Sequence, residues 1–214
     1  MRWSVKRRKR ILKRVWKFIW EDDSLLSWIV NIILAFLIIK FLLYPGLGFI
    51  SGTDLPIVAV ISQSMNHEGN FNSWWGSTPL CSAGSTCPYS QGVWYYKNNI
   101  SKDSFESFPL HNGFRRGDVI VLKGINPDKV KIGDVIVFDA KESYPVIHRV
   151  IKIFHEDEKV FFVTKGDHNP YSIVNSRLNE THVSGDKLRG KAVFKIPFVG
   201  YVRLIAADLG SLFH

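Results

Sequence analysis

The sequence predicts a mainly β domain behind a single N-terminal transmembrane helix. Three observations lead to this fold class. A strongly basic arm is followed by a long apolar run, and the chain then turns into short segments rich in Val, Ile and Phe. Turns containing Gly-Asp, Asn-Pro or Gly separate these segments, and no long amphipathic helix lies between them. This pattern favours a mostly antiparallel sheet over a parallel α/β sheet.

The positive charge is confined to the N-terminal arm. The chain has 28 Lys and Arg against 19 Asp and Glu, a net charge of +9. Residues 1–17 hold nine of the basic residues and no acidic one, so the other 19 basic residues balance all 19 acidic ones. We therefore assign residues 1–23 to a basic cytoplasmic arm, and a nucleic-acid-binding body is disfavoured.

The apolar run predicts a membrane anchor over residues 24–45. Leu25 to Tyr44 is 20 residues, about the length that a helix needs to cross a bilayer. Asn31 and Lys40 interrupt the run, and we expect Pro45-Gly46 to stop the helix. A cleavable signal peptide has a shorter apolar core followed by small residues at a cleavage site, so a retained anchor is favoured.

Orientation follows from the basic arm. Because positive charge stays on the cytoplasmic side, we expect a single-pass protein of the cell membrane with a cytoplasmic N-terminus. The domain that follows, residues 46–205, would lie on the extracytoplasmic face.

Six segments of this domain are predicted to be strands: 56–61, 118–124, 134–140, 145–155, 160–166 and 190–196. Gly-Asp-Val-Ile-Val occurs at both 117–121 and 133–137, which predicts two adjacent strands opening with the same turn. Residues 66–114 are too long for an ordinary connection, and we interpret them as an inserted flap or subdomain. Its aromatic residues are expected to cover a small core of their own, the alternative being contact with a bilayer surface or a substrate. Residues 199–214 form a candidate amphipathic segment.

The two cysteines, Cys81 and Cys87, permit a small disulfide loop. No histidine pair lies near them, so a zinc site is unexpected, and we predict no metal or other cofactor. The triplets starting at Asn99 and Asn179 match the glycosylation pattern and agree with exposure.

Three residues carry the chemistry that serine hydrolysis requires, namely a nucleophile, a base and a group that orients the base. Ser64 ends the apolar run "VAVISQSM", His148 lies within the strand "YPVIHRVIKI", and Asp167 follows a strand in "VTKGDHNP". Taken singly, each is more often an ordinary loop serine, packed histidine or turn aspartate. Their spacing alone does not bring them together.

Order and combination are more informative. Behind the anchor come Ser62-Gln63-Ser64-Met65, Arg116-Gly117-Asp118, Gly133-Asp134-Val135-Ile136-Val137-Phe138, Ile147-His148-Arg149-Val150, Lys165-Gly166-Asp167-His168-Asn169 and Gly190-Lys191-Ala192. In this order the chain resembles type I signal peptidases, particularly their archaeal and endoplasmic-reticulum branch. The resemblance covers most of residues 25–205 apart from the insertion, and it implies the signal-peptidase/LexA-like antiparallel β domain.

The resemblance also implies residue roles. Ser64 would be the nucleophile and His148 the general base, while the Ser62 hydroxyl and the Ser64 backbone N–H would form the oxyanion hole. Asp167 matches the aspartate of the family's Gly-Asp-x-Asn motif. The family usually has glycine where this chain has Gln63, and a proline close after the methionine. Its eukaryotic-type members carry a second aspartate that "GDHNPYSIVNSR" lacks, so either Asp167 alone supports His148 or the third role is missing.

The predicted function is that of a membrane-bound serine endopeptidase that removes signal peptides from exported preproteins. Its expected partners are those signal peptides, membrane lipid and further membrane subunits, and not nucleic acid. The alternative keeps the fold and drops the catalysis: a weakly active or inactive membrane-anchored β domain that binds exported polypeptides. A self-cleaving serine–lysine peptidase of the repressor type is disfavoured by the anchor and by a histidine at the base position.

Overall fold

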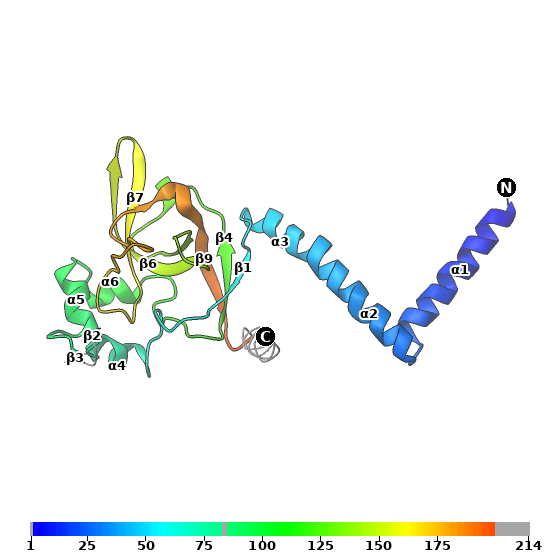
Figure 1. The fold of residues 1–214 in the computed structure, drawn as a ribbon, viewed down its shortest axis with the longest axis horizontal. Helices are drawn as coiled ribbons and strands as arrows, with labels where there is room; N and C mark the ends of the chain where they lie inside the picture. Colours follow the sequence, from blue (N-terminus) through cyan, green and yellow to red (C-terminus); the bar gives the residue numbers. More distant parts are fainter. Residues whose placement is uncertain (1, 83–84, 200–214) are drawn as a thin grey trace. The chain divides into compact units, whose positions relative to one another are not determined.

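The computed structural model describes residues 2–82 and 85–199, and it confirms a mainly β domain together with an N-terminal apolar helix (Figure 1). The chain divides into two compact units, residues 1–50 and residues 51–214. The predicted amphipathic segment 199–214 lies outside the described residues except for Val199.

The first unit is helical. Helix α1 spans Arg2–Trp20 and α2 spans Leu25–Ile38, followed by a π-helical turn, η1 (Ile39–Leu43), and by α3 (Tyr44–Ser51). From Leu25 to Ser51 these form one helix of 27 residues, the one helix in the described part of the chain whose length and composition would allow it to cross a membrane.

The prediction that this helix stops at Pro45-Gly46 is wrong, because the helix continues to Ser51. Within an α-helix a proline lacks the N–H for its hydrogen bond, and its ring clashes with the carbonyl four residues earlier. A wider π-helical turn lies directly before Pro45, where the Tyr44 N–H donates to the Ile39 carbonyl five residues back. We infer that this turn relieves the clash, so the helix passes the proline.

The second unit is built on a seven-stranded sheet in which all neighbouring strands are antiparallel. In spatial order the strands are β1 (Ile57–Ala59), β4 (Val119–Lys123), β9 (Leu188–Ile196), β5 (Val135–Phe138), β6 (Val146–Glu156), β7 (Lys159–Lys165) and β8 (Val183–Ser184). All six predicted strands are present, and the short β8 was not predicted. The 3-10 turns η2 (Pro127–Lys129) and η3 (Gly185–Lys187) lie in the connections.

The repeated Gly-Asp motif opens β4 and β5, but these strands are not neighbours because β9 lies between them. The expectation of adjacent strands is therefore wrong, while that of shared turn chemistry is confirmed. Gly117 and Gly133 both have φ +91°, a value that favours glycine. In each turn the aspartate, Asp118 or Asp134, accepts a hydrogen bond from the backbone N–H three residues earlier.

The insertion contains helices α4 (Phe71–Gly76), α5 (Gln91–Lys97) and α6 (Lys102–Glu106) and the hairpin of β2 (Leu80–Ser82) and β3 (Ser85–Thr86). Trp74, Tyr95 and Phe105 are fully buried in its core, which confirms that its aromatic residues cover a core of their own. Ile151 of β6 belongs to the same core, so the insertion also packs against the sheet. Cys81 and Cys87 form the disulfide that the sequence permits.

Candidate active site

Ser64 is presented by a turn anchored in the core. Beyond β1, Val60 still pairs with the β4 side, accepting from the Gly117 N–H and donating to the Asp118 carbonyl. The chain then turns at Gln63–Asn66, and the Met65 side chain is buried in the hydrophobic core, only 1% exposed. Because the methionine points inward, the preceding Ser64 is left half-buried at the surface.

His148 lies next to this serine. It is on β6, where it pairs with Ile136 of β5, and its side chain is almost completely buried. Its Nε2 is 2.9 Å from the Ser64 Oγ. The structure therefore brings together two residues that are 84 positions apart, at the distance that proton transfer from a serine to a histidine needs.

The acid beside His148 is Glu180, which sequence reasoning missed. Its Oε1 lies 2.5 Å from the His148 Nδ1 and accepts from the Thr164 hydroxyl at 2.9 Å, while its Oε2 accepts from the Ile173 N–H at 2.8 Å. Glu180 is fully buried. An ionised carboxylate only accepts hydrogen bonds, so this contact favours the proton on Nδ1 and leaves the Nε2 lone pair facing Ser64.

One signal for Glu180 was present in the sequence. It is the only acidic residue between Asp167 and Asp186. Its distance from the Gly-Asp-x-Asn motif, 13 residues after Asp167, hid it from a search limited to the residues directly following that motif.

Asp167 is not placed against His148, which corrects the expectation that it supports the base. Its Oδ1 accepts from the Arg149 Nε at 2.9 Å and its Oδ2 from the Arg149 Nη2 at 2.7 Å. The Tyr95 hydroxyl donates to Oδ1, and the His67 Nε2 lies 3.0 Å from Oδ2. Neighbouring residues of a strand point to opposite faces, so a carboxylate that binds Arg149 lies on the other side of β6 from the His148 ring.

Burial and ion pairing act in opposite directions on this cluster. Burial alone would raise the pKa of Asp167, but the Arg149 guanidinium and the His67 hydrogen bond hold that pKa far below its usual range. Asp167 is therefore ionised. Burial lowers the pKa of His67, opposed by the carboxylate, and the His67 ring stacks on Trp74 with ring centroids 3.6 Å apart.

The predicted oxyanion-hole groups lie beside the nucleophile. The Ser62 hydroxyl is 3.1 Å from the Ser64 Oγ, and Ser62 is exposed. The Ser64 carbonyl accepts from the His168 N–H at 2.8 Å. Within residues 2–82 and 85–199 the Ser64 backbone N–H has no hydrogen-bond partner, so it is free to donate to another group.

The loop that follows β7 fits closely against this pair. A Cβ on Gly166 would lie 2.8 Å from the Ser64 carbonyl oxygen and 2.9 Å from the His148 Nε2. Either distance is too short for a real contact, so only glycine allows the loop to approach the nucleophile and the base this closely.

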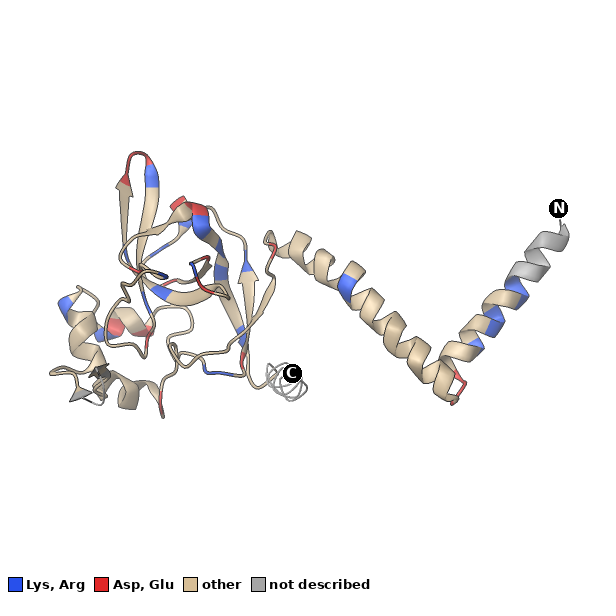
Figure 2. Ribbon diagram, viewed as in Figure 1, with Lys and Arg blue, Asp and Glu red and all other residues tan. Residues whose placement is uncertain are grey.

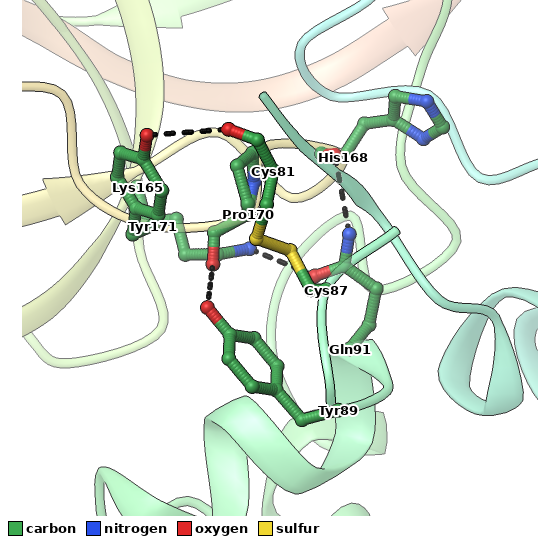
Figure 3. The surroundings of a disulfide bond; sticks show 8 residues. All are labelled: Cys81, Cys87, Tyr89, Gln91, Lys165, His168, Pro170 and Tyr171. Carbon is green, nitrogen blue, oxygen red and sulfur yellow. Dashed lines mark hydrogen bonds between the residues drawn. A yellow bond between two sulfur atoms is a disulfide. The ribbon is translucent and has the colours of Figure 1, made fainter. Parts of the chain in front are cut away.

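The insertion holds the other side of the same loop (Figure 3). The Lys165 Nζ donates to the Gln91 Oε1 at 3.0 Å, and the Gln91 Nε2 donates to the His168 carbonyl at 3.1 Å. The main chain of His168 thus bonds to Ser64 through its N–H and to the insertion through its carbonyl. Longer hydrogen bonds, both 3.5 Å, join the Tyr171 hydroxyl to the Cys81 carbonyl and the Tyr89 hydroxyl to the Pro170 carbonyl.

Lys165 is fully buried in this interface. Its ammonium group donates to three carbonyl or amide oxygens and faces the rings of Trp94 and Tyr95 at 4.9 and 4.8 Å. Burial lowers the pKa of Lys165 to about 7. It points away from Ser64 into the insertion, so the structure does not place it as a base for that serine.

A hydroxyl, an imidazole and a buried carboxylate joined in sequence by hydrogen bonds are the constellation of a serine hydrolase. Comparisons with known proteins point to a particular class of serine hydrolase. The chain is similar to the signal peptidase complex catalytic subunit SEC11 of Candida tropicalis (31% identity over 102 residues), Clavispora lusitaniae (33% over 102) and Lodderomyces elongisporus (32% over 106). Each match covers 46% of this chain and 61% of the relative. No family model matches the chain.

These homologues confirm the resemblance to type I signal peptidases of the endoplasmic-reticulum branch. The chain spans about three-fifths of the length of the relatives that it matches.

Proposed function

We propose that this chain is a membrane-bound serine endopeptidase that removes N-terminal signal peptides from exported preproteins. The observation that carries the proposal is the run of hydrogen bonds from Ser64 through His148 to Glu180. The similarity of the chain to signal peptidase catalytic subunits supports signal peptides as the substrate class, since the fold alone does not distinguish among substrates.

In the proposed reaction the Ser64 Oγ attacks the scissile carbonyl carbon while the His148 Nε2 takes the hydroxyl proton. Glu180 holds the imidazole in its tautomer and stabilises the imidazolium that forms. The Ser62 hydroxyl and the Ser64 N–H donate to the oxyanion. When the C–N bond breaks, His148 gives its proton to the leaving amine, and an ester to Ser64 remains.

Deacylation reverses the roles. Water attacks the ester carbonyl and gives a proton to His148, and that proton returns to the Ser64 oxygen as the acid product leaves. The sheet offers an edge for the substrate, because β1 is its terminal strand and leads directly to the nucleophile turn. An extended signal-peptide end could add there as a further strand through main-chain hydrogen bonds.

The proposed setting is the cell membrane. The arm of residues 1–23 would be cytoplasmic, the helix from Leu25 to Ser51 would span the bilayer, and the β domain would lie on the extracytoplasmic face. Further membrane subunits are proposed partners, because the relatives are named as subunits of a complex. A span in the same bilayer as the signal peptide would keep enzyme and substrate in one membrane and so raise their effective concentration.

The test is cleavage of a preprotein by the purified protein in lipid, with wild type compared with Ser64→Ala and His148→Ala. We expect cleavage by wild type at the signal-peptide junction and a loss of several orders of magnitude in each variant. Cleavage that survives Ser64→Ala would refute the nucleophile assignment. Binding of the preprotein without cleavage by wild type would favour the inactive β domain instead.

A further inference from the structure

Helix α1 has two chemically distinct faces over residues 10–17. Successive residues of a helix are rotated by about 100°, so Arg10, Lys13, Arg14 and Lys17 lie along one side of α1. The opposite side carries Ile11, Leu12, Val15 and Trp16, whose exposed fractions are 55, 68, 49 and 63%. Figure 2 shows basic residues recurring along α1, whereas the helix that follows is almost free of charge. Large apolar side chains exposed together on one helix face mark an interaction surface.

The C-terminal end of α1 is attached to the start of the apolar helix. The Ser27 hydroxyl donates to the Phe18 carbonyl at 2.6 Å, and the Asn31 side-chain amide donates to the Ile19 carbonyl at 2.9 Å. Both carbonyls belong to the last turn of α1, where the carbonyl groups have no N–H donor within the helix.

These two hydrogen bonds explain the polar residues in an otherwise apolar run. A backbone carbonyl without a partner is very costly at membrane depth, where water is absent. Ser27 and Asn31 lie in the first two turns of the helix that we propose to span the membrane. They satisfy the carbonyls that α1 would otherwise bring there unpaired, so the junction is suited to the bilayer boundary.

We propose that α1 is an interfacial helix that binds a membrane surface rich in anionic lipid headgroups. Its basic face would contact the headgroups, and its apolar face would enter the acyl boundary. Trp16 and Trp20, with ring centroids 5.6 Å apart, are residues typical of that depth. The proposal rests on the proposed membrane span and does not depend on peptidase activity.

The two-sided pattern favours lipid over other occupants. A nucleic acid would bind the basic face and leave the apolar face in water. A partner protein would cover the apolar face whatever the lipid charge. Only an anionic bilayer surface accounts for both faces, and α1 adjoins the helix that would enter that bilayer.

The test uses the full chain with a single fluorescent label. Both native cysteines are in the disulfide, so Leu12→Cys introduces the one free thiol for an environment-sensitive dye. The matched control is Arg14→Cys, which places the dye two residues on, roughly 200° around the helix. Each protein is reconstituted in vesicles of phosphatidylcholine alone and of an equal mixture with phosphatidylglycerol.

We expect the dye at position 12, and not that at position 14, to be blue-shifted and shielded from an aqueous quencher in the anionic vesicles. Replacing Arg10, Lys13, Arg14 and Lys17 by Gln should lower the shielded-to-exposed ratio by roughly 600-fold, since each of the four basic residues near an anionic surface contributes about 5-fold. Salt at about 1 M should have a similar effect, because the Debye length falls to about 3 Å. Replacing four exposed lysines of the β domain, Lys129, Lys131, Lys159 and Lys187, by Gln should leave the ratio unchanged.

Equal shielding of position 12 in both kinds of vesicle would overturn the proposal, because lipid charge would then play no part. Exposure of both positions in anionic vesicles would show that α1 does not bind. Flotation of the protein with the vesicles reports the span, and preprotein cleavage reports the peptidase. Failure of either is therefore separate from failure of this inference.

Discussion

Glu180→Gln is the substitution that tests the site most directly. Glutamine keeps the shape of the side chain but has one amide oxygen and one amide nitrogen. In the wild-type protein three donors converge on the Glu180 carboxylate, from His148, Thr164 and the Ile173 backbone. A glutamine cannot accept from all three. If its oxygen faces Ile173, its N–H₂ group faces the His148 Nδ1, which must then give up its proton.

The consequence for the reaction follows from the tautomer. With Nδ1 as acceptor, the proton of a neutral imidazole moves to Nε2, and the atom 2.9 Å from the Ser64 Oγ is then a donor. His148 would no longer accept the serine proton. The equivalent acid-to-amide change in a well-studied serine protease lowers kcat by about 10⁴. We expect a fall on the order of 10³- to 10⁴-fold here, equivalent to about 4–5.5 kcal/mol of activation free energy.

The assay is preprotein cleavage under single-turnover conditions, with thermal unfolding measured on the same samples. Glu142→Gln is the matched control, since Glu142 is exposed on a surface turn and should leave kcat unchanged. Glu180→Asp keeps the charge and should recover part of the activity. If Glu180→Gln keeps more than about a tenth of the wild-type kcat while remaining folded, the assignment of Glu180 as the orienting acid is wrong.

Three further outcomes follow from the contacts around the site. Asp167→Asn leaves the Arg149 guanidinium buried without its counter-ion, so the free energy of unfolding in urea should fall by about 3–5 kcal/mol, and a change below about 1 kcal/mol would contradict this. Gly166→Ala places a methyl group 2.9 Å from the His148 Nε2, so kcat should fall on the order of 10- to 100-fold with far-UV circular dichroism unchanged; wild-type kcat would show that the loop yields easily. Lys165 loses its proton near pH 7 when folded and near pH 10.5 when unfolded, so from pH 7 to pH 9 the unfolding free energy of wild type should rise relative to Lys165→Met by about 1.4 kcal/mol per pH unit; parallel pH profiles would place the folded pKa elsewhere.

The β domain was predictable because local sequence patterns identify its strands. Runs of Val, Ile and Phe indicate where a strand lies, and the turn residues that bound them indicate where it ends. Each of the six predicted strands is present in the sheet. The order of the strands in the sheet could not be predicted in this way, because it depends on pairing between distant segments. The motif repeated before β4 and β5 describes two similar turns, and nothing in it reveals that β9, over 50 residues later, pairs between them. The helix end was missed for a local reason, since a proline normally stops a helix unless a wider turn relieves its clash.

The site was partly predictable for a related reason. Ser64 and His148 sit in short motifs whose neighbours, Met65 and the alternating strand residues, fix which way they point. The acid lies outside any such motif. Glu180 reaches His148 because the chain between β7 and β8 folds back, so that the Thr164 N–H donates to the Glu180 carbonyl and the Glu180 N–H to the Ile173 carbonyl. That return is a tertiary feature that no local pattern records.

Asp167 and Glu180, the two buried acids near the site, have different roles, whereas the sequence analysis considered Asp167 alone. Asp167 receives its hydrogen bonds from Arg149, Tyr95 and His67, groups that belong to the sheet and the insertion and do not touch Ser64. Glu180 contacts the base itself. Loss of the first should therefore lower the stability of the fold, and activity should fall only with the fraction that remains folded. Loss of the second should lower kcat by orders of magnitude even in the folded fraction, beyond the cost in stability of one buried donor left without an acceptor. Because only the second variant should lower the kcat of folded protein, measuring stability and kcat on both variants distinguishes an acid that holds the loop from one that orients the base.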